Sequence, residues 1–307
     1  MSVGVFGEGV IDRFITENGS EDVIGGSALN AAVALQRAGV DAQWCARVSL
    51  DEDGSAISEY AEDNGIASDR MLRRKEPTSV VTINTSHDGL PTYDFQLDGA
   101  VDWQWTEAEL RQTLLGVDVL QMSSLSCVLS PGADALPQVL RDLKEINSAL
   151  VVCFDPNARP RAAKDDVHAQ EMKGRIAELV TLSDLVKVSD EDLEWLSPDV
   201  PPEETARAWS QQGPQVVILT CGSAGALAFQ SGRLICSVPG IKTSVVDTVG
   251  AGDTFMAWLL RGIVEDHSNQ IPAEPSDIEL LLTQAATAAA ITCSRKGCKP
   301  PLRSEVL

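Results

Sequence analysis

Short apolar runs alternate with helical stretches along most of this 307-residue chain, and this rhythm constrains the fold more than any other feature of the sequence. Apolar runs bounded by turn residues are typical of strands buried on both faces. Strands that alternate with helices predict a mostly parallel sheet covered by helices on both faces. The expected strands are 3–6, 42–48, 117–122, 149–154, 185–188 and 215–219, and the clearest expected helices are 27–38, 52–64, 134–145 and 203–211.

Two segments, 13–24 and 78–102, interrupt this rhythm. The second contains two runs of alternating character on either side of a His87-Asp88-Gly89 turn, which predicts a hairpin. We therefore expect one domain over residues 1–307, with a small accessory sheet formed by segments of about 13–24 and 78–102. Such a sheet could cover a ligand site as a lid, or it could be a surface hairpin or an interface only.

Composition narrows the class of protein. The formal net charge of −21 argues against a nucleic-acid surface, which needs clustered Lys and Arg. No apolar run reaches the roughly 18 residues of a membrane span, and the first residues lack the basic stretch that begins a signal peptide. The seven cysteines are odd in number, lie mostly in apolar runs and lack zinc-site spacing, which is typical of buried, reduced thiols. We therefore expect a cytoplasmic protein that binds neither nucleic acid nor membrane.

The segment Gly250-Ala251-Gly252-Asp253 is the strongest chemical signal in the chain. Apolar residues follow it at helical spacing, so the glycines are expected at or just inside a helix N-terminus. Free N–H groups and the positive end of the helix dipole attract anions there, and glycine lets a phosphate approach closely. Asp253 could accept the proton of an attacking hydroxyl, and the helix end should favour its ionised form. The motif predicts phosphoryl transfer to a hydroxyl, although alone it fits equally well an ordinary helix whose first-turn Asp complements the dipole.

Other segments offer polar groups beside expected strands and helices. Asn30 follows Gly26 in the first turn of a helix and could both donate to and accept from a polyol. Asp12 follows the first strand, where it replaces the third glycine of a dinucleotide-binding fingerprint and could accept hydrogen bonds from a sugar. Arg159 follows another strand and could bind a phosphate or pair with a nearby loop Asp. Residues 220–222 suit close approach of a nucleotide, and the sequence pattern of a P-loop is absent.

The order of these segments resembles that of the ribokinase-like sugar kinases, the phosphofructokinase-B type family, over nearly the whole chain. Residues 25–39 look like its N-terminal signature. Residues 247–253, Asp-Thr-Val-Gly-Ala-Gly-Asp, look like its C-terminal signature, with Val249 where a second Thr is common. The resemblance implies a three-layer α/β ribokinase-like fold, with a mostly parallel central sheet, helices on both faces and a small β lid. It also implies an ATP-dependent phosphotransferase with an alcohol group as acceptor.

The resemblance further implies roles for individual residues. Asp253 would be the catalytic base, and Gly250, Ala251 and Gly252 would form the anion hole. The sugar would be bound by Asp12, Gly26, Asn30, Phe95 and Arg159. The nucleotide would be bound by Lys187, Ser189, Thr220, Gly222, Gly225, Gly250, Gly252, Lys296 and Gly297. Asp192 would position Mg²⁺ indirectly and Asp247 would lie near a monovalent cation such as K⁺, while Ser189 and Asp192 stand where many members have Asn and Glu.

Within the family, segments 7–12, 155–160 and 292–297 look like those of bacterial fructokinases, which implies a primary hydroxyl of fructose as the acceptor. The Leu-Trp that usually follows the second segment is replaced by Arg161-Ala162-Ala163, which leaves 2-keto-3-deoxygluconate, or another sugar or nucleoside, as an alternative. Arg159 or Arg161 could then meet the acid group. Two further hypotheses are a sugar-binding pseudoenzyme without turnover and a nicotinamide dehydrogenase, which the broken fingerprint opposes. The lid edges could also pair with a second subunit to form a homodimer.

Overall fold

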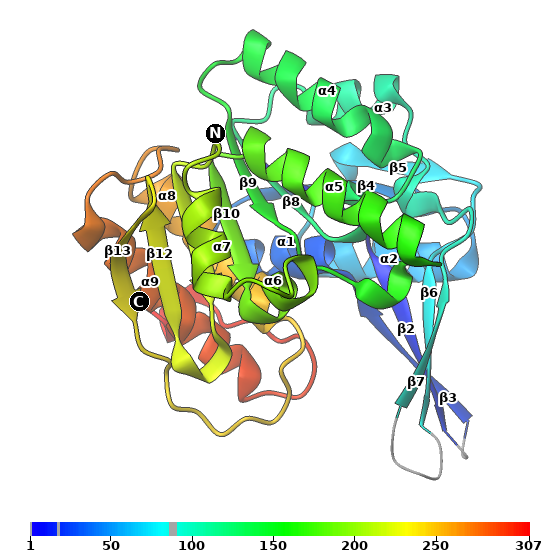
Figure 1. The fold of residues 1–307 in the computed structure, drawn as a ribbon. Helices are drawn as coiled ribbons and strands as arrows, with labels where there is room; N and C mark the ends of the chain where they lie inside the picture. The colour runs from blue at the N-terminus through cyan, green and yellow to red at the C-terminus, as the bar shows by residue number, and fades with distance from the viewer. Residues whose placement is uncertain (1, 17–18, 86–90) are drawn as a thin grey trace.

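The computed structural model describes residues 2–16, 19–85 and 91–307, and a large twisted sheet lies at its centre (Figure 1). Within these residues the sheet has nine strands in the order β13-β12-β11-β10-β9-β8-β1-β4-β5. Neighbouring strands from β11 to β5 run parallel, whereas β12 and β13 add an antiparallel edge. The strands are β1 (Val3–Phe6), β4 (Ala42–Ser49), β5 (Met71–Arg74), β8 (Val119–Ser123), β9 (Val151–Asp155), β10 (Leu185–Ser189), β11 (Val216–Thr220), β12 (Ala226–Gln230) and β13 (Arg233–Val238).

Helices cover both faces of this sheet and enclose two apolar cores. One face carries α1 (Ser27–Arg37), α2 (Glu52–Asp63), α8 (Ala251–Glu265) and α9 (Pro275–Cys293), whose apolar residues pack with Trp44 and Trp258. The other carries α3 (Glu107–Leu114), α4 (Gly132–Ile146), α5 (Asp166–Leu182), α6 (Asp190–Leu196) and α7 (Pro202–Trp209), which pack with Phe6 and Phe154. Short 3₁₀ turns are η1 (Ser68–Arg70), η2 (Val101–Trp103), η3 (Leu125–Cys127), η4 (Pro160–Ala162), η5 (Gly222–Ala224) and η6 (Arg303–Glu305).

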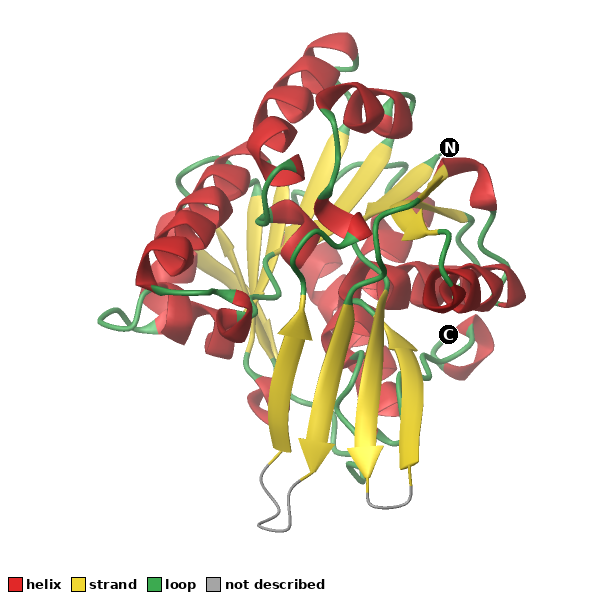
Figure 2. Cartoon of the chain, turned by 90° about the vertical axis from the view of Figure 1, so that its right-hand side faces the viewer, coloured by secondary structure: helices red, strands yellow, loops and turns green. Residues whose placement is uncertain are grey.

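A second, smaller sheet projects from one end of the molecule (Figure 2). Its order is β3-β2-β6-β7, and its strands are β2 (Val10–Thr16), β3 (Gly19–Gly25), β6 (Val80–Thr85) and β7 (Pro91–Gln96). The β2–β3 and β6–β7 pairs are antiparallel hairpins, and β2 pairs with β6 in parallel. The hairpin expected in 78–102 is thus present as β6 and β7, although its expected turn at 87–89 lies outside the described residues.

The predicted fold class is confirmed, and most of the expected elements differ from the observed ones by one or two residues at their ends. Several placements were not foreseen. Asp12 lies inside β2 rather than in the turn after the first strand, because the chain re-enters extended structure at Val10. The strands β5, β12 and β13 were not expected either, and in β13 three of the six residues are exposed, so it has no buried run. In the part of the chain that the structure describes, no helix is both long and apolar enough to cross a bilayer.

Candidate active site

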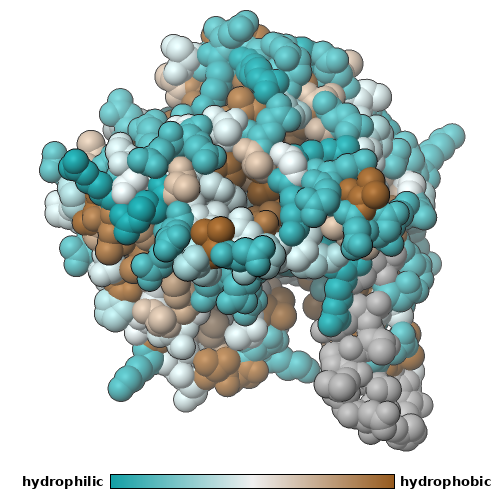
Figure 3. All heavy atoms as spheres, viewed as in Figure 1, coloured by the Kyte–Doolittle hydropathy of each residue, from teal (hydrophilic) through white to brown (hydrophobic). Residues whose placement is uncertain are grey.

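A large cavity of about 2230 Å³ lies at the carboxyl ends of the parallel strands. Glu8 follows β1, Asn157 follows β9, and Ser189 and Thr220 end β10 and β11, and all four line it. The small sheet contributes Val10, Phe14, Val81 and Ile83 to the same lining. Figure 3 shows this face of the molecule hollowed between the main body and the small sheet. Open parallel sheets bind ligands at this edge, so the central sheet places the cavity where a substrate site is expected, and the small sheet borders it.

The first turn of α8 borders this cavity. Gly250 is its N-cap in the left-handed region, with φ 75°, and a Cβ there would lie 2.1 Å from Sγ of Cys298. Glycine is therefore required at residue 250 for both backbone conformation and space. Ala251 donates its N–H to the carbonyl of Thr248 at 3.2 Å, whereas no backbone acceptor within the described residues takes the N–H groups of Gly250, Gly252 and Asp253. These unpaired amides at a helix N-terminus can bind an anion.

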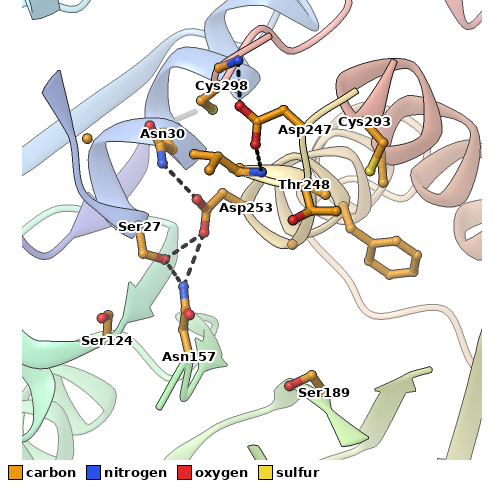
Figure 4. Close-up of a pocket in the computed structure, with 18 of the residues that line it drawn as sticks. Ser27, Asn30, Ser124, Asn157, Ser189, Asp247, Thr248, Asp253, Cys293 and Cys298 are labelled. Atoms are coloured by element: carbon orange, nitrogen blue, oxygen red, sulfur yellow. Dashed lines mark hydrogen bonds between the residues drawn. The ribbon is translucent and has the colours of Figure 1, made fainter. Parts of the chain in front are cut away.

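Three side chains from distant parts of the chain converge on the Asp253 carboxylate (Figure 4). Ser27 Oγ donates to Oδ1 at 2.7 Å, and Asn157 Nδ2 donates to the same oxygen at 3.3 Å. Asn30 Nδ2 donates to Oδ2 at 2.9 Å. Ser27 and Asn30 lie in the first turn of α1, and α1 packs against α8, which explains how the two helix beginnings meet. Asp253 is only 6% exposed, and these donors fix the orientation of its carboxylate.

Burial is the main influence on the pKa of Asp253 and raises it above the ordinary carboxyl value. Hydrogen bonds from Asn30 and Ser27, and the positive charges of Lys187 and Arg159, oppose this rise without cancelling it. The direction of the shift is therefore opposite to the one expected from the helix end, because burial outweighs the hydrogen bonds and positive charges around the carboxyl group. A raised pKa makes Asp253 a better proton acceptor in its ionised form.

A buried ion pair lies next to the first turn of α8. Lys187 Nζ and Asp155 Oδ2 are 2.8 Å apart, and the two side chains are 5% and 1% exposed. A Cβ on Gly252 would lie 3.0 Å from this Nζ, so the ammonium adjoins the unpaired amides. Burial lowers the pKa of Lys187, but the nearby carboxylates, Asp155 foremost, raise it overall, so the group stays charged. Burial raises the pKa of Asp155 to about 6 against the opposing charge of Lys187.

Asp12 on β2 and Arg159 in the loop after β9 both line the cavity. Burial raises the pKa of Asp12 to about 6, and the charge of Arg159 opposes this rise. Arg159 Nη1 donates to the main-chain oxygens of Asn157 and Ala158, at 3.3 and 3.1 Å. Arg159 lines the cavity, and within the described residues no ion pair joins its guanidinium to Asp165 or Asp166 at the start of α5.

The two carboxylates expected near metal ions both hold loops through backbone amides. Asp192 caps α6 by accepting from Ser189 N at 3.1 Å, and its other oxygen accepts from Ala158 N at 2.8 Å. Asp247 accepts from Val249 N at 3.1 Å and Gly297 N at 2.9 Å, and these bonds lower its pKa. Among the described residues, no group of three or more His, Cys, Asp or Glu side chains is arranged to hold a metal ion.

Most residues implicated by the sequence line this one cavity. They are Asp12, Gly26, Asn30, Arg159, Lys187, Ser189, Asp192, Thr220, Gly222, Gly225, Asp247, Gly250, Ala251, Gly252, Asp253 and Gly297. Lys296 does not line it, although its charge acts on Asp247. Phe95 lies on β7 opposite Val81 of β6, and its side chain lies outside the described part of the structure. Gly26 also has a packing reason, because a Cβ there would lie 2.5 Å from the carbonyl oxygen of Glu8.

Sequence reasoning missed Ser27, Asn157 and Asp155 as contributors to this site. Ser27 looked like an ordinary residue of a helix start, and the 155–160 segment drew attention only to its arginine. Their importance lies in contacts across 226, 96 and 32 residues of sequence. No local pattern signals such contacts; the only available hint was their position directly after a strand or before a helix.

Comparison with known proteins agrees with this geometry. Residues 13–305 match the pfkB family of carbohydrate kinases. A fructokinase from Rhizobium leguminosarum bv. trifolii is 29% identical over 266 residues, which cover 85% of this chain and 79% of that protein. The structure of a fructokinase from Xylella fastidiosa with bound ATP aligns with a TM-score of 0.83 at 21% identity, covering 99% and 96% of the two chains. A fructokinase double mutant from Vibrio cholerae O395, in a form bound to fructose, ADP and potassium ion, aligns with a TM-score of 0.82 at 23% identity, covering 97% and 94%.

Because the family match spans nearly the whole sequence, the chain belongs to the pfkB family of carbohydrate kinases. The predicted family and enzyme class, a phosphotransferase with an alcohol group as acceptor, are thereby confirmed. The dehydrogenase alternative no longer stands, and the solved structures show the same fold.

Proposed function

We propose that this protein transfers the γ-phosphate of ATP to a primary hydroxyl of a small sugar, with fructose as the preferred acceptor. The observation that carries the proposal is the meeting of Asp253, the unpaired amides of Gly250 and Gly252, and the Lys187 ammonium at one point of the cavity. A carboxylate that can take a proton thus stands beside groups that can stabilise a moving phosphoryl group.

In this mechanism Asp253 accepts the proton of the sugar hydroxyl as its oxygen attacks. The amides and Lys187 stabilise negative charge on the transferred group, which is the main contribution that proteins make to phosphoryl transfer. The small sheet acts as a lid, because Phe14, Val81 and Ile83 place apolar side chains over the sugar end. Excluding water there limits hydrolysis of ATP in the absence of sugar.

The part of the cavity lined by Gly222 and Gly252 suits ATP, because glycines there leave space for the nucleotide beside the backbone. A Cβ on Gly222 would meet no atom within 4 Å, and that on Gly252 would meet only Lys187. Mg²⁺ would accompany the phosphates and supply further charge stabilisation. Both oxygens of Asp192 already accept backbone hydrogen bonds, which supports contact with such an ion through water rather than directly. Asp247 is the candidate for K⁺, since its ionised carboxylate lies beside the cavity and the Vibrio relative was solved with that ion.

Fructose is favoured over an acid sugar by the charges at the sugar end. Glu8, Asp12 and Asp22 line the cavity there, and such carboxylates suit neutral hydroxyl groups. The name of the Rhizobium relative supports the same choice. The alternative is 2-keto-3-deoxygluconate, because the Arg159 guanidinium in the cavity donates only to main-chain oxygens and could bind a carboxylate.

An ATP-consumption assay over fructose, ribose, 2-keto-3-deoxygluconate, tagatose phosphate and nucleosides tests the proposal. We expect fructose to give the highest kcat/KM. A higher value for the acid sugar would support the alternative, and no turnover with any acceptor would leave only a sugar-binding role.

Two further proposals concern the state of the protein. All seven cysteines are free, which supports a reducing compartment such as the cytoplasm.

The strands β3 and β7 form the edges of the small sheet, so a homodimer could assemble by pairing the small sheets of two subunits. Light scattering of the purified protein tests this proposal, with twice the monomer mass expected.

A further inference from the structure

The Asp253 carboxylate is bonded unequally on its two oxygens. Oδ1 accepts from Ser27 Oγ and from Asn157 Nδ2, whereas Oδ2 accepts only from Asn30 Nδ2 within the described residues. A carboxylate oxygen offers about two acceptor positions. Oδ1 is therefore filled, and Oδ2 retains capacity for one more donor.

Ser27 and Asn157 also bond to each other, which fixes the direction of the hydroxyl proton. Asn157 Nδ2 donates to Ser27 Oγ at 2.7 Å, so the Ser27 hydroxyl hydrogen is directed to Asp253 Oδ1. The loop carrying Asn157 is itself fixed: Ala158 N donates to Asp192 at 2.8 Å, and Asn157 has a left-handed φ of 38°. The three groups form a closed triangle at the cavity wall (Figure 4).

We propose that Ser27 and Asn157 are positioning residues that saturate Oδ1 and so direct the sugar hydroxyl to Oδ2 of Asp253, an inference that rests on the proposed kinase function. The hydroxyl proton then passes to Oδ2 while the hydroxyl oxygen forms a bond to the γ-phosphorus. The bond from that phosphorus to the bridging oxygen of ADP breaks, and ADP leaves with the electron pair.

The hydrogen bond from Ser27 also affects the pKa of Asp253, the proposed catalytic base. Among the described residues, the charges of Lys187, Arg159, Asp155 and Cys298 also act on or respond to Asp253, and Ser27→Ala alters none of these groups. The Ser27 hydrogen bond lowers the pKa of Asp253 against the burial that raises it. Removing it leaves burial less opposed, so the carboxyl of the variant should stay protonated to higher pH.

The test compares Ser27→Ala and Asn157→Gly with the wild type and with Ser55→Ala. Glycine suits the left-handed backbone at residue 157. Ser55 lies in the first turn of α2, as Ser27 does in that of α1, but it does not line the cavity and its hydroxyl donates to the main-chain oxygen of Asp51. For Ser27→Ala we expect the acid limb of the kcat/KM profile to move up by about one pH unit. We also expect kcat to fall on the order of tenfold in both variants, with little change in KM for ATP. Ser55→Ala should match the wild type in all three.

If the acid limb of the kcat/KM profile did not move in Ser27→Ala, the inference would be overturned, as it would by an equal shift in Ser55→Ala. A loss of kcat with the limb unmoved would mean a structural role only. The carboxyl ¹³C resonance of Asp253, assigned by its loss in Asp253→Asn, reports the same shift without turnover. The inference can therefore fail while the wild type phosphorylates fructose, and a wild type inactive on every sugar would refute the proposed function separately.

Discussion

Gly252 leaves open the space beside the Lys187 ammonium: a Cβ at residue 252 would lie 3.0 Å from Nζ. Lys187 cannot move aside easily, because it is buried and paired with Asp155 at 2.8 Å. We predict that Gly252→Val lowers kcat/KM for ATP on the order of 10²-fold by crowding the phosphate contacts. Steady-state kinetics with ATP as the varied substrate measures this.

Gly174→Ala is the matched control for that variant, since a Cβ at this position of α5 meets nothing within 4 Å. It should leave the kinetics unchanged and the stability equal or slightly higher. Unaltered ATP affinity and rate in Gly252→Val would count against the assignment of this helix turn to phosphate binding.

A substitution in the small sheet should change KM for the sugar without changing KM for ATP. Phe14 lies on β2 and lines the sugar end of the cavity. Phe14→Ala should raise KM for the sugar about tenfold, because burying a large apolar side chain contributes about 1.5–3 kcal/mol. KM for ATP should change little. The exposed Val167 on α5 offers a control through Val167→Ala, and an equal rise in both KM values would argue against a lid over the sugar alone.

The buried carboxyl group of Asp102 should make the free energy of unfolding depend on pH. Asp102 lies in η2, where its carboxylate accepts from Gly9 N at 3.3 Å and Ser79 Oγ at 2.7 Å, at the starts of β2 and β6. Burial, with a smaller contribution from Glu8, raises its pKa to about 7 from 3.8. The folded protein therefore holds a proton that the unfolded chain releases between these values, so this group lowers the free energy of unfolding as pH rises through that window.

Asp102→Asn should remove this dependence, because the amide stays neutral. Relative to the wild type, the variant should gain about 1.4 kcal/mol of unfolding free energy for each pH unit across the window. Urea denaturation at several pH values between 4 and 8 measures the difference. Identical pH dependence in the two proteins would show that Asp102 is not the group responsible.

The sequence was sufficient to predict the parallel sheet, the small accessory sheet and the helix that begins at the α8 motif, because each depends on local periodicity or on residues adjacent in the chain. It was not sufficient to predict the surroundings of Asp253. Ser27 and Asn157 reach this carboxylate only through the packing of α1 and the β9 loop against α8. The depth of its burial, which reverses the expected pKa shift, likewise arises from elements distant in sequence.

The variant Asp253→Asn tests the central claim most directly, because it keeps the shape of the side chain and removes its ability to accept a proton. The measurement is formation of phosphorylated fructose from ATP, followed by ³¹P NMR, for the variant and the wild type at equal ligand occupancy. We predict product from the wild type and a rate at least about 10²-fold lower from the variant, with the affinities for ATP and sugar retained. Comparable product formation by both proteins would contradict the role assigned to Asp253.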